Sequence, residues 1–148
     1  MSLLRDNLVE IIDNLSNTGI INSSLITEDG IVVASNNTFN QESKDLNKNI
    51  GAISASIISI AEKGLEILSE SVLLEQIKID VGIDENIEHD FTILIERVCS
   101  NLLLQILFPK RLNIGVIHYE TKKSISLIKK IINDKNIKEL FTNIDNLS

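Results

Sequence analysis

The chain of 148 residues is short of the residue types that build metal centres and disulfides. It has one cysteine and two histidines. A lone Cys99 cannot form an intramolecular disulfide, and one Cys with two His cannot supply a structural zinc site without carboxylates. The length is nevertheless sufficient to bury a real core. We expect one ordered domain that holds no metal and no cofactor.

Positive charge is also scarce. The 14 Lys and Arg residues face 21 Asp and Glu residues, which gives a net charge of −7. Sequence-independent binding of nucleic acid and of anionic membranes depends on clustered basic residues, so neither is expected.

Long apolar runs are missing as well. The best candidate for a membrane span, residues 50–60, is too short and too rich in Ser. Residues 1–12 lack the basic patch and uninterrupted apolar core of a secretion signal. We expect a cytoplasmic protein that neither is secreted nor spans a membrane.

Motifs that carry chemistry are absent or incomplete. No phosphate-binding glycine motif follows a strand, and Glu62-Lys63-Gly64 falls within a helical pattern. His89, in the acidic turn 84–90, could join a weak divalent-metal site, although such turns are usually just solvated. His118 has no evident catalytic partner, and Cys99 suits a small buried filler. We predict no catalytic residue and no enzyme.

The residues that are plentiful define a regular series of elements. Apolar residues at helical spacing predict a first helix over residues 3–15. Two β-branched runs joined by Glu28-Asp29-Gly30 predict a hairpin over Leu25 to Ser35, LITEDGIVVAS. The polar stretch Asn36 to Asn49 is interpreted as a loop.

A second helix is predicted over Ile50 to Ser69, and strict alternation predicts a half-buried strand over Leu74 to Asp84. Two more strands follow, Phe91 to Val98 and residues 102–108, before Pro109. A long helix then begins near Leu112. The inner stripe of the second helix is predicted to be Ile50, Ile53, Ile57, Ile60, Gly64 and Leu68, and that of the last helix Ile114, Ile117, Thr121, Ile125, Ile128 and Ile132.

This order of helix, two strands, helix, three strands and helix predicts a compact α+β domain around an antiparallel sheet. We place it at residues 1–133. Residues 134–148 form a short amphipathic extension with its own apolar stripe, which could dock on the domain, on a dimer mate or on another partner, or order only on binding.

The second helix carries another stripe. Gly51, Ala55 and Ser59 recur at intervals of four, with Ile58 and Leu65 beside them and Glu62 and Glu66 further along. A ridge of small residues flanked by apolar ones allows another helix to come close, which favours a helix–helix contact between subunits. The alternative is an ordinary exposed face rich in Ser and Ala.

With these elements in order, the sequence resembles the Roadblock family, named after the dynein light chain and including bacterial and archaeal polarity regulators. The resemblance rests on the first helix, the hairpin LITEDGIVVAS, the helix NIGAISASIISIAEKGLEIL, and LLLQILFPKRLNIGVIHYETKKSISLIKKI. Together these segments cover most of residues 3–132.

The resemblance implies a five-stranded antiparallel sheet with the middle helix on one face and two helices on the other. It also implies a homodimer, or a heterodimer with a paralogue, in which middle helices pair and third strands meet. The implied contact residues are Gly51, Ala55, Ile58, Ser59, Glu62, Leu65 and Glu66 on the helix and Ile77, Lys78, Ile79 and Asp80 on the strand.

Members of this family typically bind Ras-like small GTPases as scaffolds or regulators, or serve as adaptor subunits of motor complexes. The resemblance therefore implies a non-enzymatic, dimeric partner of a small GTPase, with Glu62, Lys63 and Glu66 at the edge of the docking surface. A small-molecule sensor of the PAS or GAF type is an alternative. It requires a ligand-sized polar cavity between sheet and helix.

Overall fold

A computed structural model describes residues 3–36, 42–68, 75–82 and 90–132, and the side chains of residues 42–53 lie outside that description. The elements are α1 (Leu3–Asn14), the 3₁₀ turn η1 (Leu15–Thr18), β1 (Asn22–Thr27), β2 (Val32–Ser35), α2 (Glu42–Leu65), β3 (Gln76–Val81), β4 (Phe91–Cys99), β5 (Leu102–Pro109) and α3 (Ile114–Ile131).

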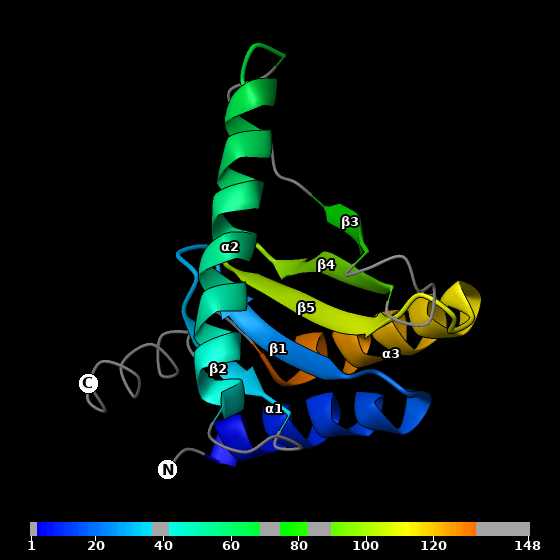
Figure 1. The fold of residues 1–148 in the computed structure, drawn as a ribbon. Coiled ribbons are helices and arrows are strands. Elements are labelled where there is room, and N and C mark those ends of the chain that lie inside the picture. The colour runs from blue at the N-terminus through cyan, green and yellow to red at the C-terminus, as the bar shows by residue number, and fades with distance from the viewer. Residues whose placement is uncertain (1–2, 37–41, 69–74, 83–89, 133–148) are drawn as a thin grey trace.

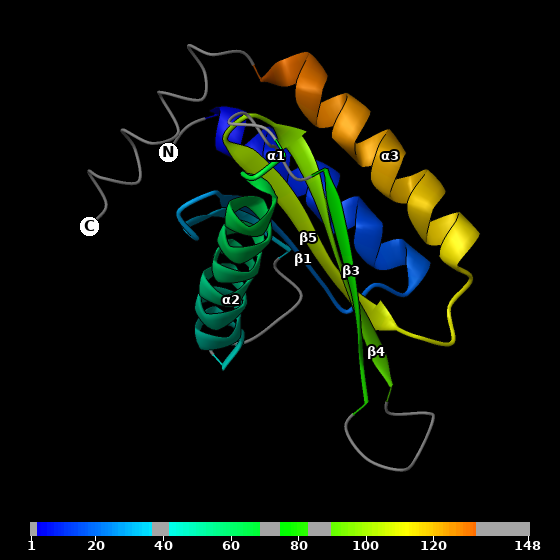
Figure 2. The same cartoon turned by 90° about the horizontal axis from the view of Figure 1, so that it is seen from above.

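The five strands form one sheet in the order β2-β1-β5-β4-β3, and all four neighbouring pairs are antiparallel. Helices α1 and α3 cover one face, and α2 lies on the other (Figures 1 and 2). This is the predicted α+β architecture, with one helix on one side of the sheet and two on the other.

The main core lies between the sheet and the pair α1 and α3. It contains large side chains that exclude solvent almost completely: Leu8, Ile12, Leu15, Leu25, Leu94, Leu102, Leu104, Ile106, Phe108, Ile117 and Ile128. A much smaller cluster lies under α2, formed by Ile26, Ile58, Ile95 and Leu103.

The hairpin is confirmed. Gly30 adopts φ +89°, which favours glycine, and the amides of Gly30 and Ile31 both donate to Thr27, one to its carbonyl and one to its side chain. The polar turn Glu28-Asp29 is thereby fixed beside the α2 face of the sheet.

The predicted loop over Asn36 to Asn49 is wrong at residues 42–49, because α2 begins at Glu42 and not at Ile50. Residues 42–49 lack apolar periodicity, but Glu, Lys and Leu are good helix formers. Extending an existing helix costs far less than starting one, so a polar segment can continue it.

Two predicted inner stripes also need correction. Ile60 and Leu68 are 71% and 79% exposed, and Gly64 is exposed too, whereas Ser54 and Ile58 are buried. The inner face of α2 is therefore the side of Ser54 and Ile58, and of the second stripe Ser59 is exposed while Ala55 is only half-buried. Ile114 is 38% exposed because it is the first residue of α3, which Asn113 caps.

Other predictions fall partly or wholly outside the described residues. These are residues 37–41 of the predicted loop, Ser69 at the end of the predicted second helix, the side chains of Ile50 and Ile53 in its predicted inner stripe, the ends of the strand predicted over Leu74 to Asp84, the turn with His89, and the extension 134–148.

Candidate functional site

The inner face of α2 rests on the sheet through few contacts. Ile58 is 3% exposed and packs with Ile26, Ile95 and Leu103. This face includes part of the ridge predicted to meet another subunit. Ile58 itself is consequently unavailable to a partner in this arrangement.

Arg97 connects α2 to the hairpin across the sheet. Its guanidinium lies 2.7 Å from the carboxylate of Glu28 and 3.3 Å from that of Glu62, and it also donates to the carbonyl of Ser100 at 2.9 Å. Its side chain is only 4% exposed. Because a buried guanidinium is stable only when its donors are satisfied, this cluster fixes α2 against the β1–β2 turn.

An open groove of about 310 Å³ runs between that turn and the second half of α2. Four of its eight lining residues are acidic and one is basic; the lining is formed by Glu28, Asp29, Ala55, Ile58, Ser59, Glu62, Lys63 and Glu66. The ridge predicted for helix pairing thus faces this groove instead of pointing straight away from the sheet.

The outward side of α2 is apolar. Ile60 is 71% exposed and Ile67, just after the helix, is 92% exposed, while Leu65 and Leu68 are also exposed. The second half of α2 extends past the sheet, as Figure 1 shows. Leu65, the last residue of α2, is 41% exposed. Large apolar side chains gathered in this way are typical of a protein–protein contact.

Strand β3 lies at the edge of the sheet and pairs, within the described part of the chain, with β4 alone. Its half-buried Ile77 and Ile79 pair with Ile95 and Ile93 and so share the α2 face. Lys78 and Asp80 are exposed on the opposite face, where Asp80 accepts a hydrogen bond of 2.8 Å from Thr92. Such an edge presents backbone groups that another strand can pair with.

The residues predicted for the interface therefore divide among several places. Five of them come together in the acidic groove: Ala55, Ile58, Ser59, Glu62 and Glu66. Leu65 lies at the end of α2, and Ile77, Lys78, Ile79 and Asp80 alternate across β3. Gly51 is in α2, but its surroundings are outside the described side chains.

Sequence reasoning missed Ile60, Ile67 and Leu68 as exposed apolar residues, and Arg97 as an anchor. The signal for Arg97 was present, since alternation along β4 puts it on the same face as Ile93 and Ile95. A basic residue on an apolar strand face needs an acidic partner.

Residues with possible chemistry remain scattered over the described ranges. Those ranges contain no group of three or more His, Cys, Asp and Glu residues that could hold a metal ion, and no helix long and apolar enough to cross a membrane. Cys99 is half-buried against the main core, in agreement with a filling role. His118 lies 3.6 Å from the buried carboxylate of Glu96, which Lys122 also approaches at 3.4 Å.

Solved structures share this fold. Myxococcus xanthus MglB is 18% identical, covers 84% of this chain and 94% of its own, and has a TM-score of 0.65. The gliding protein MglB from Thermus thermophilus is 13% identical, with coverages of 88% and 92% and a TM-score of 0.70. A Roadblock/LC7 domain from Streptomyces avermitilis is 15% identical, with coverages of 88% and 95% and a TM-score of 0.59.

No protein-family model matches the chain, and a search of curated proteins likewise gives no match. The structural likeness extends over most of both chains in each case. The protein has a Roadblock-type fold.

Proposed function

We propose that this protein is a dimeric, non-enzymatic scaffold or regulator of a Ras-like small GTPase. The observations that carry the proposal are the exposed apolar side chains of Ile60 in α2 and of Ile67 and Leu68 just after it, together with the place of β3 at the edge of the described sheet. The Roadblock-type fold supports it, because that family pairs subunits through these two elements.

In the proposed dimer, Ile60 and Ile67 meet the second subunit, and β3 pairs with its counterpart. This proposal uses a different side of the helix from the one that the sequence favoured. The ridge of Ala55 and Ser59 stays in the groove beside the β1–β2 turn. It remains free to receive a third protein.

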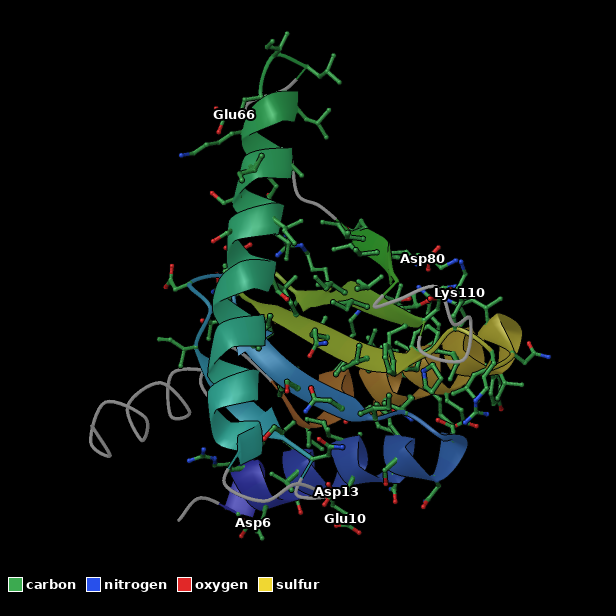
Figure 3. The ribbon with its side chains drawn as sticks, in the orientation of Figure 1. Asp6, Glu10, Asp13, Glu66, Asp80 and Lys110 are labelled. Atoms are coloured by element: carbon green, nitrogen blue, oxygen red, sulfur yellow. The ribbon has the colours of Figure 1, made fainter. Side chains whose placement is uncertain are left out.

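The GTPase is proposed to dock across the paired α2 helices, with Lys63 and Glu66 at the rim. Both are exposed, and Figure 3 shows Glu66 at the end of α2 that projects past the sheet. Glu62 is less available because it is bound to Arg97. Rim charges of this kind mainly affect the rate and selectivity of association.

The main alternative is a small-molecule sensor. Among the described side chains, Ile58 packs directly on Ile26, Ile95 and Leu103 between α2 and the sheet, and this apolar contact favours the scaffold. A motor-complex adaptor would use the same dimer but a different partner.

The test is a binding assay with Ras-like GTPases encoded beside the gene, each loaded with GDP or a non-hydrolysable GTP analogue. We expect at least one to bind in one nucleotide state, and the variant Lys63→Glu/Glu66→Lys to weaken binding about tenfold while leaving the dimer intact. That double exchange leaves the net charge unchanged. If no GTPase binds in any nucleotide state, the GTPase proposal is contradicted. The proposed dimer is tested separately, by the oligomeric state of the chain.

A further inference from the structure

In the layer formed by α1 and α3, one helix is mainly acidic and the other mainly basic. Helix α1 has one Arg against three acidic residues, and α3 has four Lys against one Glu. The two helices are in contact and run in opposite directions, as Figures 1 and 2 show.

The acidic residues of α1 share one face. Asp6, Glu10 and Asp13 follow at intervals of four and three, opposite the buried Leu8 and Ile12. Asp6 and Glu10 are exposed, and Figure 3 shows them on the side of α1 away from the sheet.

The lysines of α3 have matching spacing. Lys123 and Lys130 are exposed and seven residues apart, as Asp6 and Asp13 are. Seven residues of helix span about 10.5 Å. A groove between the helices, of about 270 Å³, is lined by Ile11 and Asn14 of α1 and by Lys123 and Leu127 of α3. The middle of α1 is therefore level with the stretch of α3 between the two lysines.

We propose that two copies of this chain pack face to face through their α1 and α3 layers. A two-fold axis parallel to the helices and between them places each α1 over α3 of the other copy. Because α1 and α3 are antiparallel, Asp6 then meets Lys130 and Asp13 meets Lys123 of the second copy, with Glu10 between them. The symmetry repeats every pair, as an isologous contact requires.

Apolar side chains on the same surface add to the contact. Val116 is 50% exposed and Tyr119 66% exposed, and Leu127 lies at the groove. This surface is on the opposite side of the sheet from α2. It goes beyond the proposed dimer and links one dimer to the next.

The test is a charge exchange between two chains. The variant Asp6→Lys/Glu10→Lys makes both helices basic, and Lys123→Glu/Lys130→Glu makes both acidic. In either variant alone, α1 and α3 carry net charges of the same sign, although Asp13 still meets Lys123 in the first variant, so the dissociation constant of the larger assembly should rise about tenfold or more. An equimolar mixture of the two variants should restore the larger assembly, because each α1 then meets an α3 of opposite net charge.

Sedimentation velocity at about 0.02 M and about 0.5 M salt measures the outcome, since exposed pairs are screened at the higher value. At low salt, we expect the native chain to form a larger assembly than either variant forms alone. The control Lys110→Glu/Arg111→Glu changes the net charge by the same amount as Lys123→Glu/Lys130→Glu, outside this surface, and should behave as the native chain does.

Three results would overturn the proposal. They are a native chain with no larger assembly at low salt, either variant alone assembling like the native chain, or a mixture that fails to assemble. Binding of the α3 lysines to anionic lipid vesicles, with no assembly in the mixture, would assign this face to a membrane instead.

Discussion

The two faces of the sheet are built differently. On the α1 and α3 face, large apolar residues from six elements fill one continuous core. On the α2 face, the buried cluster has four members, and the side chain of Gln105 is fully buried without a hydrogen bond in the described part of the chain. Among the described residues, the first face buries many more apolar side chains than the second, and α2 leaves apolar side chains exposed.

Two adjacent residues of β4 show the same division. Glu96 points to the α3 side, where Lys122 and His118 approach it, and Arg97 points to the α2 side, where it binds Glu28 and Glu62. On the α1 and α3 face, called the packed face below, Glu96 lies beside an extensive core. On the α2 face, called the open face below, the ion pairs of Arg97 do much of the anchoring of α2 to the sheet.

The largest expected effect is on the packed face. Phe108→Ala should lower the free energy of unfolding by about 3–5 kcal/mol, because it empties the site of a side chain that is 1% exposed. Chemical denaturation measures the change. A loss below about 1 kcal/mol would mean that this face is not the main source of stability.

A substitution on the open face should lower the free energy of unfolding by less. Arg97→Ala is expected to lower the free energy of unfolding by about 2 kcal/mol, because it leaves two carboxylates without their partner. The loss is limited because both carboxylates can still reach water: the side chains of Glu28 and Glu62 are 37% and 20% exposed. Denaturation of the matched variant Lys63→Ala, at an exposed site on α2, should show a change within about 0.5 kcal/mol. Equal effects at both positions would remove Arg97 from its anchoring role.

A smaller effect tests how α3 begins on the packed face. The side chain of Asn113 accepts hydrogen bonds from the amides of Gly115 at 2.9 Å and Val116 at 3.4 Å. Asn113→Ala should therefore cost about 1 kcal/mol, and Asn113→Ser much less, because Ser can cap as well. Thermal denaturation of both variants distinguishes them, and identical melting temperatures would exclude a cap.

The sequence predicts the order and type of the elements because periodicities of two and 3.6 residues are local properties. It predicts the core-facing sides of α1 and α3 for the same reason, since Leu8, Ile12, Ile117 and Ile128 have no competing stripe. The start of α2 is not predicted from the sequence, because polar residues can extend a helix that is already formed.

The candidate site is less predictable. Helix α2 has two stripes of similar apolarity, and only the packing of Ile58 on the sheet decides which is inner. The partners of Arg97 are 69 and 35 residues away along the chain, so the fold alone brings them together. An edge strand can be suspected from its alternation, but its place at the edge depends on the strand order.

The central claim is that the outer side of α2 is a subunit contact. Ile60→Glu places a charge on that side, and Ile114→Glu makes the same substitution at an exposed Ile on the packed side. We predict that light scattering after gel filtration shows a native dimer, a monomer for Ile60→Glu with unchanged far-UV circular dichroism, and a dimer for Ile114→Glu. A charge in an apolar contact should raise the dissociation constant about 100-fold or more. A dimer for Ile60→Glu as stable as the native one, or a native chain that is monomeric throughout, would contradict the account.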